Sequence, residues 1–257
     1  MQLPELTLHT ADVKIPGRVL ASCLSGSWLY GIHTETSDLD WKYVYVVPNK
    51  TLLGLYPPHE NKLTREGKIE NLDSLGTLYE WVAHEVGKFA RLLLKGNPTM
   101  IEMISYPKYD PALEEGHPLW TELRKKAPEF MTQRTVGQYL GYINGQMQRL
   151  RKGMKLHTGN KGEYNTKWAY HMVRLAWDLI EIIEGRLPAV CHLEEKRELL
   201  KDIRANNYTE DEIIEMVLTL ITQVELRKPW DNLPEEGPSA WMNDWLLRVR
   251  AELGELG

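Results

Sequence analysis

The feature that most constrains the fold is a change of hydrophobic period part-way along the chain. The strongest strand candidate is 41-WKYVYVVP-48, which is aromatic and β-branched, and a second candidate covers residues 77–84. From residue 84 the apolar spacing becomes helical, and it stays so after residue 118. The later helix-like segments are 118–130, 132–155, 163–185, 193–205, 209–226 and 238–253. The sequence therefore predicts an α+β fold: a small mixed β-sheet with flanking helices, followed by an all-helical C-terminal half.

Local signals mark several element ends. Gly96-Asn97-Pro98 ends one helix and starts another, because proline suits the first helical turn. Thr209 and Glu212 have the spacing of a capping box. The segment 49–76, rich in proline, glycine and charge, predicts a loop. Residues 106–118 read as a boundary loop, so we expect two domains, residues 1–117 and 118–257.

Composition restricts the function classes. The 257 residues carry a net charge of −5, so nucleic-acid binding requires a local basic surface. Cys23 and Cys191 lie far apart without metal-ligand spacing, which predicts buried thiols in a reducing compartment. The N-terminus lacks the pattern of a signal peptide, and no apolar run has the length of a membrane span. We expect a cytoplasmic protein without a membrane partner.

Two aspartates stand at the mouth of the strongest strand, in 36-TSDLDW-41. Side chains two positions apart on a strand point to one face, so Asp38 and Asp40 bring two carboxylates together. Such a pair is unfavourable unless a cation lies between the carboxylates, and Mg²⁺ prefers these hard oxygen ligands. Alone, the pair also fits ordinary turn residues that precede a strand.

A Gly-Ser turn precedes the aspartates. Gly26-Ser27, with Gly31 close behind, predicts a turn whose backbone N–H groups and hydroxyl face a phosphate. A phosphate-binding turn followed by paired carboxylates fits nucleotidyl transfer, in which metal ions bridge the nucleotide phosphates.

Taken in order, these motifs resemble the polymerase-β nucleotidyltransferase superfamily. The pattern Gly26-Ser27-x-x-Tyr30-Gly31 followed by Asp38-x-Asp40 is most similar to its bacterial and phage group of predicted nucleotidyltransferases linked to RNA repair. The resemblance continues through 85-EVGKFARLLLKGNPTMIEMI-104 and 167-KWAYHMVRL-175, and spans roughly residues 20–205. It implies a transferase that uses an NTP and two Mg²⁺ ions, with Mn²⁺ as an alternative ion.

The resemblance also implies a third carboxylate on a neighbouring strand. Glu80 is the candidate by position, although the family more usually has Asp there, and Asp73 is the runner-up. Asp38, Asp40 and Glu80 are thus the predicted catalytic and metal-binding residues. The predicted nucleotide-binding residues are Gly26, Ser27, Tyr30, Lys155, Lys167, His171 and Arg174.

Positive charge gathers in the helical half. Lys167, His171 and Arg174 fall on one helical face, which suits contact with a triphosphate. The other interpretation is that this helical face is only solvated, and that His171 is simply a buried histidine with a hydrogen-bond partner. Arg149, Arg151, Lys152 and Lys155 extend the basic track toward a polynucleotide backbone.

These patterns favour a nucleotidyltransferase. The family resemblance implies that its acceptor is the 3′ end of an RNA, such as a cleaved tRNA, and the basic track agrees with this expectation. Two alternatives stay open: transfer to a small molecule or protein hydroxyl, and a module that binds nucleotide or nucleic acid without catalysis. The sequence leaves the oligomeric state open.

Overall fold

The computed structural model describes residues 13–70, 78–105, 114–151, 164–190, 193–227 and 229–255. The chain divides into two compact units. The first unit contains residues 1–93, 106–126 and 238–257, and the second contains residues 94–105 and 127–237.

This division differs from the predicted single boundary between residues 117 and 118. The C-terminal helix α10 (Ser239–Leu253) belongs to the first unit, where the buried Trp245 Nε1 donates a hydrogen bond to the carbonyl of Leu119 at 2.9 Å. A contact between residues so far apart along the chain leaves no local signal in the sequence.

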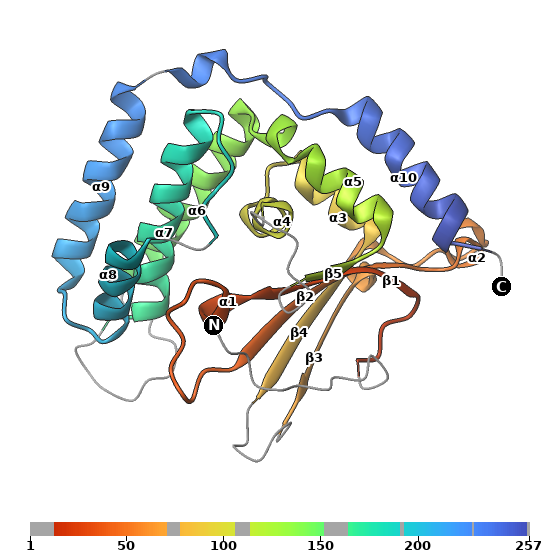
Figure 1. Ribbon diagram of the computed structural model, residues 1–257, viewed down its shortest axis with the longest axis horizontal. Coiled ribbons are helices and arrows are strands. Elements are labelled where there is room, and N and C mark those ends of the chain that lie inside the picture. Colours follow the sequence, from red (N-terminus) through yellow and green to blue (C-terminus); the bar gives the residue numbers. More distant parts are fainter. Residues whose placement is uncertain are drawn as a thin grey trace. The chain divides into compact units, whose positions relative to one another are not determined.

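The first unit is built on a mixed five-stranded sheet with the order β3-β4-β2-β1-β5 (Figure 1). Its strands are β1 (Arg18–Ser25), β2 (Leu39–Val46), β3 (Thr64–Ile69), β4 (Tyr79–Glu85) and β5 (Glu114–Gly116). β2 and β4 run parallel, and the other neighbouring strands are antiparallel. The predicted α+β class and the mixed sheet are confirmed.

Strand β4 buries one face and leaves the other half-exposed, whereas β2 is half-exposed only at Asp40, Trp41 and Lys42. On β4, Tyr79, Trp81 and Ala83 are buried, whereas the alternate residues Glu80 and Val82 are half-exposed. This alternation follows from the period-two geometry of a strand. The buried face packs in a core with aromatic residues of β2 and with Val13 of the N-terminal segment. On the opposite face, the half-exposed positions lie around Asp40, Lys42 and Glu80, while Val44 and Val46 further along β2 are buried.

Strand β3 corrects the prediction that residues 49–76 form only a loop. The same segment also contains α2 (Asn49–Leu53) and a 3-10 helix, η1 (Glu60–Leu63). β3 reads TREGKI, whose charges and glycine indicate a loop. Gly67 is needed there because a Cβ at this position would lie 2.6 Å from the Trp81 indole ring of β4. Tertiary packing, which the local pattern does not contain, makes this segment a strand.

Three longer helices lie together on one side of the sheet in the first unit (Figure 1). They are α3 (Val86–Leu94), α5 (Pro118–Lys125) and α10. The Phe89 ring of α3 and the Trp120 ring of α5 are 5.4 Å apart, and both residues are buried. A short helix, α1 (Gly26–Leu29), follows β1 directly.

The described part of the second unit is helical. It contains α4 (Pro98–Ile104), α6 (Gln133–Arg151), α7 (Thr166–Ile183), α8 (Glu194–Arg204) and α9 (Glu210–Leu226), with two 3-10 helices, η2 (Ala127–Phe130) and η3 (Pro229–Asn232). Helix α7 packs against α6, α8 and α9, which is why most of its surface is buried.

The predicted helix caps are present in this unit. The Asn97 side chain accepts hydrogen bonds from the backbone N–H groups of Thr99 and Met100 at 3.0 and 3.4 Å, which caps α4. Thr209 and Glu212 form the predicted capping box at the start of α9. Among the described residues, the helices are all too short or too polar to cross a membrane.

Candidate active site

The candidate site begins where β1 ends. Ser25, the last residue of β1, lies opposite Asp40 in β2, and Gly26 follows with a left-handed φ of +68°. A Cβ on Gly26 would lie 2.1 Å from Asp40 Oδ2, so the backbone at this glycine directly borders the carboxylate. Glycine is the residue that tolerates both the positive φ and this close approach.

Ser27 and Tyr30 lie on the first turn after this glycine. Ser27 is 9% exposed and Tyr30 is 2% exposed. The Tyr30 backbone N–H donates to the Gly26 carbonyl at 3.2 Å, which closes the short helix α1. The turn predicted for Gly26-Ser27 is therefore present, while the Tyr30 side chain belongs to the core and does not face solvent.

The loop between α1 and β2 is held by local contacts that set the position of Asp38. The Trp28 and His33 rings stack 3.8 Å apart, and Trp28 Nε1 donates to the Ser37 carbonyl at 3.3 Å. The buried Ser37 hydroxyl accepts a hydrogen bond from the Thr34 backbone N–H at 2.8 Å. These contacts stiffen the approach to β2 and leave the Asp38 side chain exposed.

The parallel pairing of β2 and β4 places Asp40 beside Glu80. The two residues are direct partners in the register, so their side chains project from the same face of the sheet. Both are half-exposed. This pairing of two predicted carboxylates, with the Gly26 turn against one of them, is the central geometric feature of the site.

Glu80 lies between Asp40 on β2 and Lys68 on β3. Lys68 is the register partner of Glu80 on the edge strand, and its ammonium forms an ion pair and a hydrogen bond with Glu80 Oε1. These contacts with Glu80, together with the nearby Asp38 carboxylate, raise the pKa of Lys68. Sequence reasoning missed Lys68 because β3 reads as a loop.

The predicted metal ligands are only partly assembled. Across the described ranges, no three His, Cys, Asp or Glu side chains are grouped so that they could hold a metal ion. Asp38 and Asp40 nevertheless supply the hard oxygen ligands that suit Mg²⁺, at the mouth of one strand. Glu80 is in register to join them, but its carboxylate is turned to Lys68. The carboxylates of Asp38, Asp40 and Glu80 therefore suit a hard divalent cation if Glu80 gives up its ion pair with Lys68.

Arg174 in the second unit does not present the phosphate-binding group that the sequence predicts. Its guanidinium is buried and forms ion pairs with Glu102 at 2.7 Å and with Asp178 at 3.1 Å. Burial raises the pKa of Asp178 to about 7, an effect that Arg174 opposes and Glu102 reinforces. Arg174 thus neutralises buried carboxylates inside the helical unit, because two acids of its own unit lie within reach.

His171 also departs from its predicted role. Burial lowers the pKa of His171 well below its usual value, and the charges of Arg174 and Lys167 lower it further. The imidazole is therefore neutral near pH 7 and adds no positive charge, which agrees with the buried-histidine interpretation. Among Lys167, His171 and Arg174, which share one helical face, Lys167 alone is exposed. Lys155 and the runner-up acid Asp73 lie outside the described residues.

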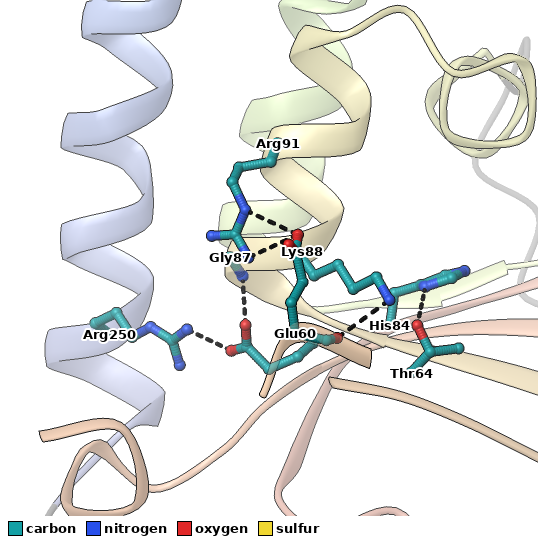
Figure 2. A network of polar contacts seen from close by, with 8 residues as sticks. Glu60, Thr64, His84, Gly87, Lys88, Arg91 and Arg250 are labelled. Atoms are coloured by element: carbon teal, nitrogen blue, oxygen red, sulfur yellow. Dashed lines mark hydrogen bonds and ion pairs between the residues drawn. The ribbon is translucent and has the colours of Figure 1, made fainter. Parts of the chain in front are cut away.

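A polar network fixes the far end of β4 (Figure 2). Glu85 Oε2 accepts a hydrogen bond from the Gly87 backbone N–H at 2.8 Å, and its other oxygen pairs with Arg250 of α10. Arg91 of α3 donates to Glu60 at 3.3 Å. Because Glu85 is buried, these contacts hold the strand that carries Glu80 against α3 and α10.

The chain matches a known protein family over most of its length. Residues 4–225 match the sequence model of a family described as the RNA repair pathway DNA polymerase beta family. A similar curated protein is an uncharacterized 38.9 kDa protein in the nrdC-mobD intergenic region of Enterobacteria phage T4, 27% identical over 125 residues. That match covers 47% of this chain and 35% of the phage protein, or about a third of its length.

A solved structure is also similar: a nucleotidyltransferase-like protein from Exiguobacterium sibiricum 255-15, 13% identical with a TM-score of 0.32. The match covers 96% of this chain and 78% of that chain. The family match confirms the resemblance that the Gly-Ser and Asp-x-Asp motifs indicate.

Proposed function

Because this chain belongs to the RNA repair pathway DNA polymerase beta family, we propose that it transfers a nucleoside monophosphate from an NTP to the 3′ hydroxyl of an RNA. The observation that carries the proposal is the pairing of Asp40 and Glu80 across two parallel strands, with the Gly26 turn against Asp40. Paired carboxylates beside a phosphate-binding turn are the groups that phosphoryl chemistry requires.

Asp38, Asp40 and Glu80 would hold the divalent cation, either Mg²⁺ or Mn²⁺. When bound, such an ion neutralises phosphate charge and makes the attacking hydroxyl more acidic. Gly26 and Ser27 would bind the β- and γ-phosphates through backbone N–H groups and the hydroxyl. In the reaction, the acceptor oxygen bonds to the α-phosphorus as the bond to the departing pyrophosphate breaks. A carboxylate of the Asp40–Glu80 pair accepts the hydroxyl proton.

The acceptor is proposed to be RNA on the family description and on local basic groups. Arg149 and Arg151 at the end of α6, and Lys167 at the start of α7, are exposed cations of the helical unit. Lys167 would contact phosphate, whereas Arg174 and His171 would not. From the sequence we also expect the helical half, residues 118–257, to cover the nucleotide and the acceptor.

One observation favours a second function, an RNA-binding module without catalysis. Lys68 neutralises Glu80, so the third carboxylate is already satisfied without a metal ion. In that case Asp38 and Asp40 alone would remain for a cation.

A labelling assay separates these functions. The protein is incubated with each α-labelled NTP, Mg²⁺ and one of two RNAs, with a 3′ hydroxyl or a 3′ phosphate. We expect label on the 3′-hydroxyl RNA alone, and none with Asp40→Asn. Asp244→Asn is the matched control, because Asp244 is an exposed carboxylate on α10 of the same unit. Absence of label with every NTP, while RNA is still retained, contradicts the transferase and supports the binding module.

A further inference from the structure

The half-open face of the sheet continues beyond the carboxylates as a basic surface. Lys42 lies two positions after Asp40 on β2, so both side chains project from the same face. In the register, Lys42 is the partner of Val82 on β4, which is half-exposed. At about 3.3 Å per residue, the Lys42 backbone lies roughly 7 Å from that of Asp40.

The same face then reaches His84 and Lys88. His84 projects from β4 on the side of Glu80 and Val82, about 13 Å along the strand from Glu80. Lys88, one turn into α3, directs its ammonium at the Glu60 carbonyl at 3.3 Å (Figure 2). An ammonium has three donors, so this bond leaves donor capacity for an anion.

His84 lies close enough to Lys42 and Lys88 for both charges to act on it. Burial lowers the pKa of His84 to about 4, and the positive charges of Lys88 and Lys42 lower it further. The neutral His84 ring lies 3.2 Å from the Thr64 hydroxyl through Nδ1 (Figure 2). His84 is therefore a neutral hydrogen-bonding group close to two cations.

Acidic neighbours limit the surface but do not cancel it. Glu66 of β3 is the register partner of Val82, on the opposite side of that residue from Lys42. The Glu60 carboxylate is paired with Arg91. Lys42 has no acidic register partner, since Cys23 and Val82 flank it on the neighbouring strands.

We infer that Lys42 and Lys88, with the neighbouring His84, bind the phosphodiester backbone of the acceptor strand and lead its 3′ end to Asp40 and Glu80. The inference rests on the proposed function. An acceptor hydroxyl that meets the carboxylates must arrive with its preceding phosphates over an adjoining surface. The half-exposed Lys42 and Val82 lie two positions after Asp40 and Glu80 on this face, and the spaced positive charge of Lys42 and Lys88 is what a nucleic-acid backbone requires.

The test measures RNA affinity against salt. A single-stranded RNA oligonucleotide is titrated with the full-length protein in EDTA, at several KCl concentrations, by fluorescence anisotropy. The slope of log K against log salt is negative, and each lost phosphate contact lowers its magnitude by about 0.7 for single strands. We expect that decrease for Lys42→Gln and for Lys88→Gln. Lys14→Gln is the control, because Lys14 is exposed beside Val13, which packs on the opposite face.

The outcomes separate this inference from the proposed function. Unchanged slopes for both variants, with RNA labelling intact in the wild type, overturn the surface and leave the transferase standing. If both variants lower the magnitude of the salt slope but the wild type labels no RNA, the surface is an RNA interface and the transferase proposal is wrong. A loss of NTP affinity in Lys42→Gln, with the RNA slope unchanged, assigns the charge to the triphosphate and overturns the inference. Circular dichroism verifies that each variant is folded.

Discussion

Replacement of Gly26 by alanine tests whether the turn positions Asp40. An added Cβ would lie 2.1 Å from Asp40 Oδ2, whereas real Cβ contacts are not closer than 3.0 Å. The carboxylate and the turn must therefore separate by about 0.9 Å, the difference between these two distances. A misplacement of about 1 Å in a reacting site costs on the order of 10²-fold in rate. We expect Gly26→Ala to lower kcat/KM for nucleotide transfer by about that factor.

The substitution also strains the backbone. A non-glycine residue at a φ of +68° is destabilised by about 1–2 kcal/mol relative to right-handed geometry. Gly185 supplies the matched control, because its φ is +73° and a Cβ there would meet nothing within 4 Å. Gly185→Ala should therefore lose a similar free energy of unfolding, measured by urea denaturation, with kcat/KM unchanged.

The comparison between the two alanine variants decides the point. If Gly26→Ala keeps the kcat/KM of the wild type, or loses no more than Gly185→Ala, the turn does not position Asp40. A lower affinity for Mn²⁺ in Gly26→Ala alone would locate the defect at the carboxylate.

Three further predictions follow from the charged contacts. Lys68→Gln releases Glu80, so Mn²⁺ affinity measured by calorimetry should rise by no more than about fivefold, and weaker binding would contradict the Lys68–Glu80 contact. Arg174→Gln leaves two buried acids without their cation, so the free energy of unfolding should fall by about 3–5 kcal/mol while the KM for NTP stays unchanged. If the KM for NTP rises while the free energy of unfolding is unchanged, Arg174 contacts the NTP phosphates and this interpretation is wrong. The pKa of Asp178 is raised in the folded state, so the folded protein holds this proton more tightly than the unfolded chain does. The stability that the proton contributes is complete below about pH 4 and is lost as the pH rises through 7. The stability difference between wild type and Asp178→Asn should accordingly decrease over pH 4–7, and a difference independent of pH would contradict it.

Much of the candidate site follows from short-range patterns. Asp38 and Asp40 lie at the mouth of β2 because the aromatic and β-branched run after them forms a strand. Gly26 adopts a left-handed turn, as a glycine at the end of an apolar segment predicts. The position of Glu80 came from the family resemblance, and the register of two parallel strands then placed it beside Asp40.

The errors fall where a side chain has a choice of partners. Helical spacing correctly places His171 and Arg174 on one helix, α7, but spacing does not state what packs against that helix. Arg174 pairs with Glu102, which is far away in the sequence and close in the folded unit. The same limit hid Lys68, since β3 exists only through its pairing with β4.

The sequence by itself determined the family, the period of each long element, the helix caps and the ordered pair of aspartates. These features depend on backbone geometry over a few residues, which the residue types control directly. The tertiary structure alone decided that α10 joins the sheet unit, that Lys68 pairs with Glu80, and that Lys42 and His84 project from the same face of the sheet. These relations depend on which distant segments meet, because burial and charge act through space and not along the chain.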